Sequence, residues 1–330
     1  MIRLVSVMII PMPAVWQELT VDNIFKMVEA VVEVPLSSIC LRRNSYINRV
    51  YELEYLASRE RIIIKFYRPG RWTPAMIEEE HAFLKELADR EVPVIPPLSI
   101  GNKTLFSDGA FNFAIFPKKG GRAMDEFDQD TWQILGRLLA KIHQVGEKHT
   151  TSSRLVWEPA VATKKHLEII LQSDYILPDF RPAFTQVTEM FIKKFSPQFA
   201  GQKKILLHGD CHKGNLIVRP GEGIFIVDFD DLCLGPAVQD LWMLLPGPVD
   251  KSENELNWFL AGYSLFHDFD KKSLALIPAL RGMRVIHYVA WLATQFHDPD
   301  FHNHFPEAGK PRYWNEIIKD LQEVVYGEES

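Results

Sequence analysis

The chain has 330 residues, which is long enough for two domains or two lobes and for a sizeable hydrophobic core. Hydrophobic residues make up 47% of it and charged residues 24%. These values are typical of globular proteins and argue against a chain that is disordered throughout. The net charge of −6 argues against a nucleic-acid partner bound through a broad basic face. Cys40, Cys211 and Cys233 are too few and too scattered for a disulfide framework or a four-thiolate zinc site, so we expect a reducing cytoplasm.

The N-terminal stretch MIRLVSVMIIPMPAV combines one arginine with a short apolar run, as a secretory signal does. Pro11 and Pro13 interrupt that run, however, and acidic amphipathic sequence follows directly. We therefore expect a start-site extension or a buried N-terminal segment here. No other stretch reaches the roughly 18 uninterrupted apolar residues that a membrane span needs, so we expect no membrane partner.

The first part of the chain alternates between helical and strand patterns. Apolar residues at helical spacing predict a helix over 20–34. Three short runs have strand character and lie near 38–43, 48–56 and 61–67. Thr73 as the N-cap and Pro74 at the first helical position then predict a helix that runs to about Asp89.

Two further apolar stretches, VPVIPPLSI at 92–100 and FNFAIFP at 111–117, predict strands. Gly120 and Gly121 end this β-rich region. Beyond it the chain becomes mostly helical, with apolar helical patterns over 128–147, 239–245, 255–266 and 276–296.

A small β island at 205–228 interrupts the helical region. Together the patterns predict an α+β fold with two lobes. We expect a β-rich N-terminal lobe over 1–118 and a mainly helical C-terminal lobe over 119–330.

The β island holds the residues with the clearest chemistry, HGDCHKGN at 208–215. After it, LIV and IFIV on either side of RPGEG predict a hairpin. The hairpin places Asn215 and Asp228 on the same edge, and Asp210 faces that edge from the loop. Magnesium prefers such hard oxygen ligands and is usually bound by a few protein groups together with phosphates.

Two other interpretations of the same motif compete with this one. A metal hydrolase would take its first ligands from His208, Asp210 and His212. Their spacing places them on one face of a strand, and Gly209 and Gly214 exclude a helix of the H-E-x-x-H type. Cys211 could serve as a nucleophile, but nothing in the sequence lowers its pKa, so we expect a small packed residue.

The order D-x-x-x-x-N, hairpin, D-F resembles the catalytic and metal loops of protein kinases. His-Gly precedes the aspartate where protein kinases have His-Arg, and Asp230 follows Phe229 where they have glycine. These departures resemble the aminoglycoside-phosphotransferase-like branch of the kinase fold, which includes choline, homoserine and fructosamine kinases. With NSYINRVYEL, KFYRPGRWT, EEH and GPAVQDLWMLL, the motifs resemble the bacterial stress response kinase A family from about residue 44 to Trp314.

Members of that family are described as Ser/Thr protein kinases with a small-molecule-kinase fold. The resemblance implies that Asp210 orients the attacking hydroxyl or accepts its proton, and that Asn215 and Asp228 hold Mg²⁺ against the nucleotide phosphates. It also implies that Lys65 contacts the α- and β-phosphates. We expect an ion pair between Lys65 and Glu80, with Glu79 as the alternative partner. Retention of Lys65, Asp210, Asn215 and Asp228 counts against a catalytically inactive nucleotide-binding module.

The expected nucleotide loop, RNSYINRVY, contains no glycine, unlike the corresponding loop of protein kinases. Backbone N–H groups in a tight turn could still cradle phosphate, and the resemblance assigns Ser45 to that role. An ordinary hairpin turn is the alternative. We expect adenine to pack near Ile64 and Phe116 and to bond the backbone of 116–119.

Several residues near the motif have expected supporting roles. In the kinase fold an aspartate at the position of Asp240 braces the catalytic loop, and we expect His208 to brace the same loop. Arg281, Arg284 and His287 share one helix face and are candidates for the acceptor side. The alternative is a helix with solvated surface cations.

The sequence therefore predicts an ATP- and Mg²⁺-dependent phosphotransferase with a two-lobed protein-kinase-like fold. The resemblance favours a Ser/Thr protein kinase that also phosphorylates itself. A small-molecule kinase of the choline, homoserine or aminoglycoside type is the alternative. We expect a monomer whose acceptor is a protein serine or threonine or a small alcohol.

Overall fold

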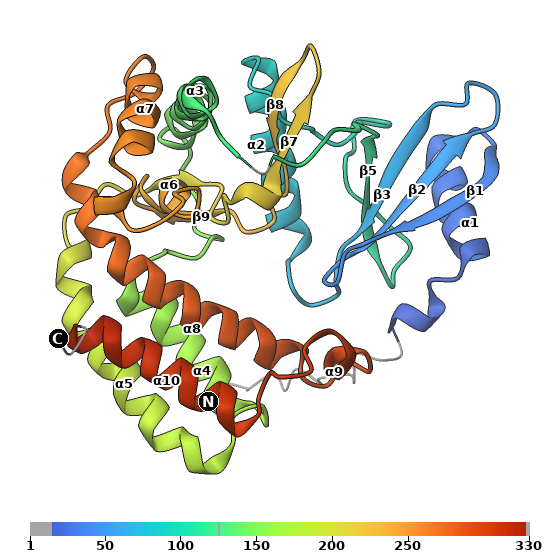
Figure 1. Cartoon of the computed structure of the whole chain (residues 1–330). Coiled ribbons are helices and arrows are strands. Elements are labelled where there is room, and N and C mark those ends of the chain that lie inside the picture. The colour runs from blue at the N-terminus through green and yellow to red at the C-terminus, as the bar shows by residue number, and fades with distance from the viewer. Residues whose placement is uncertain (1–14, 125, 328–330) are drawn as a thin grey trace, which may run out of the picture.

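The computed structural model describes residues 15–124 and 126–327. The N-terminal stretch that we expect to be an extension or a buried segment therefore lies, up to residue 14, outside the described residues. Within those ranges an antiparallel sheet forms the N-terminal part and helices dominate the C-terminal part (Figure 1). The predicted α+β, two-lobed fold is confirmed.

Five strands in the described chain form the N-terminal sheet, in the order β1-β2-β3-β5-β4, and each neighbouring pair is antiparallel. From β1 to β5 they span Leu36–Arg43, Arg49–Tyr55, Arg61–Phe66, Phe106–Ser107 and Asn112–Pro117. The three predicted runs before residue 68 are thus confirmed as β1, β2 and β3. In the central strand β3, Lys65 lies opposite Val50 on one side and Ala114 on the other.

Two helices accompany the sheet. Helix α1 (Val21–Val32) packs Ile24 and Val28 against one face of it, and Figure 1 shows α1 on the outer side. Helix α2 (Pro74–Asp89) begins where the Thr73 hydroxyl oxygen accepts a hydrogen bond from the Met76 N–H at 3.3 Å, as predicted. Its buried residues Phe83, Leu84 and Leu87 belong to a hydrophobic cluster of the C-terminal part, so α2 connects the two lobes.

The strand predicted over 92–100 is wrong. Only Ile100 forms a β-bridge there, with Lys103, and the preceding residues are irregular. Pro93, Pro96 and Pro97 lack backbone N–H donors and therefore cannot build a regular ladder. The Leu98 N–H still bonds the Ile115 carbonyl at 2.7 Å, which holds the segment beside β5.

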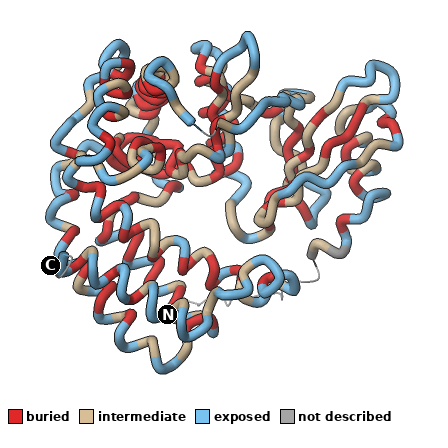
Figure 2. Tube along the Cα trace, in the orientation of Figure 1, coloured by how far each residue is buried: buried red, intermediate tan, exposed pale blue. Residues whose placement is uncertain are grey.

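The C-terminal part consists mainly of helices, as predicted. Helices α3 to α10 span Gln129–Gly146, Lys164–Gln172, Arg181–Phe195, Gln239–Trp242, Glu253–Tyr263, Ile277–Gln295, Phe301–His304 and Pro311–Tyr326. One core joins α4, α5, α8 and α10, and a second joins α2, α3 and α7 with the central hairpin. Figure 2 shows that buried residues follow the inner faces of these helices.

The predicted β island is present and contains two short ribbons. Strand β7 (Leu216–Arg219) pairs with β8 (Gly223–Ile226) in the predicted hairpin. Strand β6 (Ile205–Leu207) pairs with β9 (Cys233–Gly235), a strand that we did not predict. Both ends of the segment that carries the polar motif are therefore fixed by strand pairing.

Among the described helices, none has the length and apolar character required to cross a membrane.

Candidate active site

The loop between β6 and β7 is held by Asp240, as predicted. Both Asp240 carboxylate oxygens accept backbone hydrogen bonds, from the His208 N–H at 2.9 Å and from the Gly209 N–H at 2.8 Å. His143 lies 3.2 Å from the same carboxylate. Because Asp240 and Gly209 are buried, these bonds fix the backbone that presents Asp210.

His208 also braces the loop, as predicted. Its Nε2 donates to the Val227 carbonyl at 2.9 Å, and its Nδ1 accepts from the Asp210 N–H at 3.3 Å. Both ring nitrogens are thus engaged within the protein. This arrangement leaves no lone pair for a metal ion and disfavours a metal hydrolase.

Asn215 and Asp228 lie together at the base of the hairpin. The Val227 N–H donates to the Asn215 carbonyl at 3.0 Å, which aligns the residues beside Asp228 with Asn215. The Asn215 side-chain N–H donates to the Asp210 carbonyl at 2.9 Å, so the amide oxygen is the end that could meet a cation. The Asn215 side chain is thereby tied to the loop of Asp210, and the backbone of Asn215 to the residue before Asp228.

Asp228 has an unusual backbone conformation. Its φ is +65°, a left-handed value that costs an ordinary L-residue roughly 1–2 kcal/mol. Its side chain is 56% exposed but opens into the cleft between the lobes. Burial of the surrounding cleft and the nearby carboxylates of Asp230 and Asp231 raise the pKa of Asp228. A cation would relieve this repulsion between carboxylates.

Lys65 reaches into the same cleft from β3. Its Nζ bonds Asp230 and lies 3.5 Å from Asp228 Oδ1. Burial alone would lower the pKa of Lys65, but Asp230 and Asp228 raise it well above its ordinary value. The amine is therefore charged and ready to bind an anionic group.

The ion pair that we expected between Lys65 and Glu80 is not found; Asp230 takes the place of Glu80. Glu80 is 2% exposed and lines the cleft, and its burial and the charge of Asp230 raise the pKa of Glu80 to about 8. A protonated Glu80 offers Lys65 little attraction at neutral pH. The alternative partner, Glu79, instead pairs with Arg154 at 2.9 Å.

Sequence reasoning missed the role of Asp230. Its carboxylate accepts from the Asn48 side-chain N–H at 2.8 Å and lies 4.0 Å from Arg71, in addition to the bond from Lys65. Burial raises the pKa of Asp230, but Lys65 and Arg71 more than offset this, so the pKa falls below its ordinary value. The repeated acids in VDFDD were the signal that could have indicated it.

A cavity of about 450 Å³ lies between the sheet and the hairpin. Lys65, Asp228 and Ser45 lie at its polar end, and Phe116 belongs to its apolar lining. The expectation for Ile64 is wrong, because this residue is fully buried in the core under α1. Side chains alternate along a strand, so its neighbour Ile63 faces the cavity instead.

A second cavity, of about 260 Å³, lies on the other side of Asp228. It brings Asp210, Asp228 and Ser45 together with residues of α8. Arg284 of α8 forms an ion pair with Asp210, with Nη1 2.8 Å from Oδ1. Burial raises the pKa of Asp210, but His212 and Arg284 lower it by more, so the carboxylate is ionised at neutral pH.

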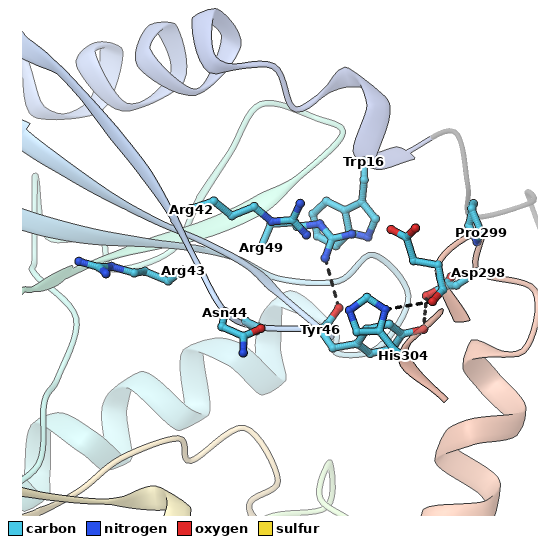
Figure 3. Close-up of a pocket in the computed structure, with 11 residues that line it drawn as sticks. Trp16, Arg42, Arg43, Asn44, Tyr46, Arg49, Asp298, Pro299 and His304 are labelled. Carbon is cyan, nitrogen blue, oxygen red and sulfur yellow. Dashed lines mark hydrogen bonds between the residues drawn. The ribbon is translucent and has the colours of Figure 1, made fainter. Parts of the chain in front are cut away.

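An outer cavity of about 500 Å³ continues from this point and shares Ser45 and Tyr46 with the second. Figure 3 shows Trp16, Arg42 and Arg49 above Tyr46 and the segment of Asp298 to His304. The Tyr46 hydroxyl donates to Asp298 at 3.2 Å, and this contact joins the turn after β1 to the segment after α8. The turn of Ser45 thus faces three cavities.

The thiol and metal-cluster interpretations find no support. Cys211 is fully buried, and burial together with the charges of Asp240 and Asp210 raises the pKa of its thiol well above the ordinary value. A thiol that is neutral and inaccessible is a poor nucleophile. The described residues contain no group of three or more His, Cys, Asp or Glu side chains that could hold a metal ion by themselves. A cation here would need ligands from a phosphate as well.

The sheet, the cleft and the paired loops define the chain as a phosphotransferase, and comparison with known proteins agrees. Residues 38–277 match the phosphotransferase enzyme family (APH), and the chain belongs to this family. It is 37% identical over 276 residues to stress response kinase A of Escherichia coli (strain K12), covering 82% of each chain. It is 36% identical over 276 residues, again 82% of each, to the serine/threonine protein kinase RdoA of Salmonella typhimurium.

Among solved structures, the chain is similar to amicoumacin kinase hAmiN in complex with AMP-PNP, Ca²⁺ and Ami. The TM-score is 0.73 at 17% identity, and the match covers 92% of this chain and 93% of that one. This likeness concerns the fold.

Proposed function

We propose that the chain is an ATP- and Mg²⁺-dependent kinase that transfers the γ-phosphate to a serine or threonine hydroxyl of a protein, including its own. The observation that carries the proposal is the convergence of Lys65, Asp210 and Asp228 on two cavities that share Asp228, with Asn215 bonded to the Asp210 carbonyl beside them. Each has the chemistry that phosphoryl transfer requires of its position.

The nucleotide would occupy the larger of these two cavities. Its apolar lining, which includes Ile63 and Phe116, suits a base, and Lys65 lies at the polar end where phosphates would be placed. Backbone N–H groups of the turn at Ser45 would face the same phosphates. Binding there would draw Lys65 away from Asp230.

Asn215 and Asp228 would hold Mg²⁺, which offsets the negative charge of the phosphates when it is bound. The donor set fits, because an amide oxygen and a carboxylate are hard ligands and magnesium usually retains phosphate oxygens and waters as well. Asp230 stands beside them and could join the set once Lys65 turns to the phosphates.

Asp210 would orient the acceptor hydroxyl or accept its proton. Its carboxylate is ionised, as a base must be, and the bonds from Asp240 to the loop hold its backbone rigidly. Attack would be in line on the γ-phosphorus, and most of the rate gain would come from positioning and electrostatics.

The choice of a protein acceptor and of a role in a bacterial stress response rests on the names of the relatives, stress response kinase A and serine/threonine protein kinase RdoA. A small alcohol is the second candidate, because a structural neighbour is named an amicoumacin kinase. Two lobes over about 1–118 and 119–330, a monomeric state and a cytoplasmic location remain part of the proposal. The three free cysteines suit a reducing compartment.

The test is turnover of γ-labelled ATP with Mg²⁺ by the purified protein alone, with a generic protein substrate, and with a panel of small alcohols. Labelled protein that is no longer formed by Asp210→Ala supports the first candidate. Labelling of a small alcohol alone supports the second. Absence of nucleotide binding would contradict both. A catalytically inactive module would bind ATP and transfer nothing.

A further inference from the structure

Arg284 occupies a position that the reaction described above does not explain. It projects from α8 and pairs with Asp210 at 2.8 Å, yet 31% of its side chain is exposed. Of the three acceptor-side candidates on this helix, Arg281 is exposed to solvent and His287 contacts His166 at 3.2 Å. Only Arg284 reaches the proposed catalytic aspartate.

The Arg284 side chain also lines a fourth cavity, of about 180 Å³, whose wall includes Gly209 next to Asp210. Arg284, His287 and Asp231 belong to the linings of both this cavity and the 260 Å³ cavity, so they form a shared wall. A hydroxyl placed at Asp210 would therefore have Arg284 directly beside it, and an adjoining group of the same molecule could enter the smaller cavity.

The smaller cavity has apolar walls and a net positive charge. Trp72, Leu155 and Trp157 are among its apolar residues. Its charged side chains are Lys165, Arg284 and Asp231, and Asp231 is paired with Arg71 at 2.8 Å. Within the described part of the chain, Lys165 makes no hydrogen bond or ion pair.

The two histidines of this cavity do not alter that balance. Burial lowers the pKa of each to about 3, helped by His287 beside His166 and by Arg284 and Arg71 near His287, so both rings are neutral. Arg284 places one Nη beside Asp210 as an ion pair, and its guanidinium has five N–H donors in a rigid fork that suits a carboxylate or phosphate. The cavity therefore offers two cations to one small anionic group.

We propose that Arg284 is a specificity-determining residue of the acceptor site, which binds an anionic group next to the acceptor hydroxyl with the help of Lys165. This inference rests on the proposed phosphotransfer and adds the charge of the acceptor to it. A cationic amino alcohol would meet repulsion from both side chains, because like charges in a partly buried site are costly. An acidic or phosphorylated residue beside a serine would meet attraction.

The experiment measures phosphotransfer from labelled ATP to two matched sets of acceptors. One set contains serine peptides that differ only in an Asp, Ala or Lys beside the serine, and the other contains glycerate, glycerol and choline. In each set whose members the protein phosphorylates, we expect kcat/KM for the anionic acceptor to exceed that for the cationic acceptor by roughly ten- to a hundredfold. Arg284→Gln should abolish this preference mainly by raising KM for the anionic acceptor.

Three further variants separate charge from structure. Arg284→Lys keeps the charge and should keep the order of acceptors, whereas Lys165→Gln should weaken the preference in part. Arg281→Gln removes an exposed arginine of the same helix and should change nothing. Thermal unfolding and nucleotide binding of Arg284→Gln should match the unaltered protein, which would exclude a folding defect.

The outcomes distinguish this inference from the proposed function. A charge preference that survives in Arg284→Gln, or no preference in the unaltered protein, would overturn the role of Arg284. Autophosphorylation without transfer to any member of either set would overturn it too, while the proposed function would stand. No phosphotransfer at all would overturn both.

Discussion

Asp230 stands where protein kinases have glycine, and its carboxylate organises the polar side chains of the cleft. It accepts hydrogen bonds from Lys65 and from Asn48 in the turn after β1. The lysine that we expected to be positioned by a helix residue is therefore positioned by Asp230, from the segment after β8. Only the fold could reveal this, since the two residues are 165 positions apart.

Replacement of Asp230 by asparagine should destabilise the protein strongly. Lys65 would then lose the buried carboxylate that it bonds, and removal of one member of a buried pair costs about 3–5 kcal/mol. Urea unfolding measures the loss. Asp231→Asn is the matched control, because this carboxylate is 28% exposed and Arg71 would keep Asp230 at 4.0 Å, which limits the cost to about 1 kcal/mol. Equal effects of the two substitutions would contradict the account.

Glu80 should make the stability depend on pH. Its pKa is raised from 4.5 to about 8 in the folded protein, so the folded state binds the proton more tightly than the unfolded state between these values. The contribution of Glu80 to the free energy of unfolding should therefore fall as the pH rises from about 4.5 to about 8. Unfolding of Glu80→Gln across this range gives the comparison, and a difference that does not vary with pH would show that Glu80 titrates normally.

At the scale of elements, the loop between β6 and β7 depends on Gly209, the glycine of the HGD sequence. Gly209 has a φ of +84°, and a Cβ there would lie 2.1 Å from the Asp231 carbonyl oxygen. The backbone of the loop that carries Asp210 and that of the segment after Asp228 therefore touch at this residue. No side chain fits between them.

Gly209→Ala should thus cost more than backbone strain alone. The strain is worth about 1–3 kcal/mol, and the clash with backbone would in addition displace Asp210, so phosphotransfer should fall together with stability. Gly221→Ala is the matched control, because Gly221 has a φ of +79° with nothing within 4 Å of the added Cβ. Gly221→Ala should lower the free energy of unfolding by about 1 kcal/mol and leave the activity unchanged. Normal turnover by Gly209→Ala would contradict the close approach.

The sequence predicted the elements better than their contacts. Strands β1 to β3, the capped helix α2 and the hairpin β7–β8 follow from local patterns and were predicted. The residues at 92–100 were misassigned because apolar composition was given more weight than three prolines. Ile63 and Ile64 were exchanged because a run of three consecutive isoleucines does not indicate which face is buried.

Contacts between distant segments were not predictable in detail. The motif residues Asp210, Asn215 and Asp228 lie within 19 positions of one another, so spacing and a hairpin could bring them together. Arg284 reaches Asp210 from another helix, and the pattern of α8 alone allowed either a site residue or a surface cation. Packing of α8 beneath the cleft decides between these possibilities (Figure 1).

At the scale of the whole molecule, the proposed nucleotide cavity lies between two lobes that α2 connects. A ligand that binds there contacts the sheet and the hairpin together, so it should stabilise the folded chain as a unit. At a hundredfold excess over Kd, MgATP should add about 2.7 kcal/mol. Thermal unfolding with and without MgATP measures this, and Asp228→Asn should lose the part that depends on Mg²⁺. An unchanged Tm at saturating MgATP would contradict the assignment of the cavity.

The most direct test is single-turnover transfer of the γ-phosphate from saturating MgATP by the unaltered protein and by Asp210→Asn. Asparagine has nearly the same shape as aspartate, so nucleotide affinity should be retained. It cannot accept a proton, so the transfer step should be slower. We predict transfer that is roughly 10²–10⁴-fold slower in the variant. A variant that binds MgATP and transfers phosphate at the unaltered rate would contradict the claim that this cleft is a phosphotransfer site built around Asp210.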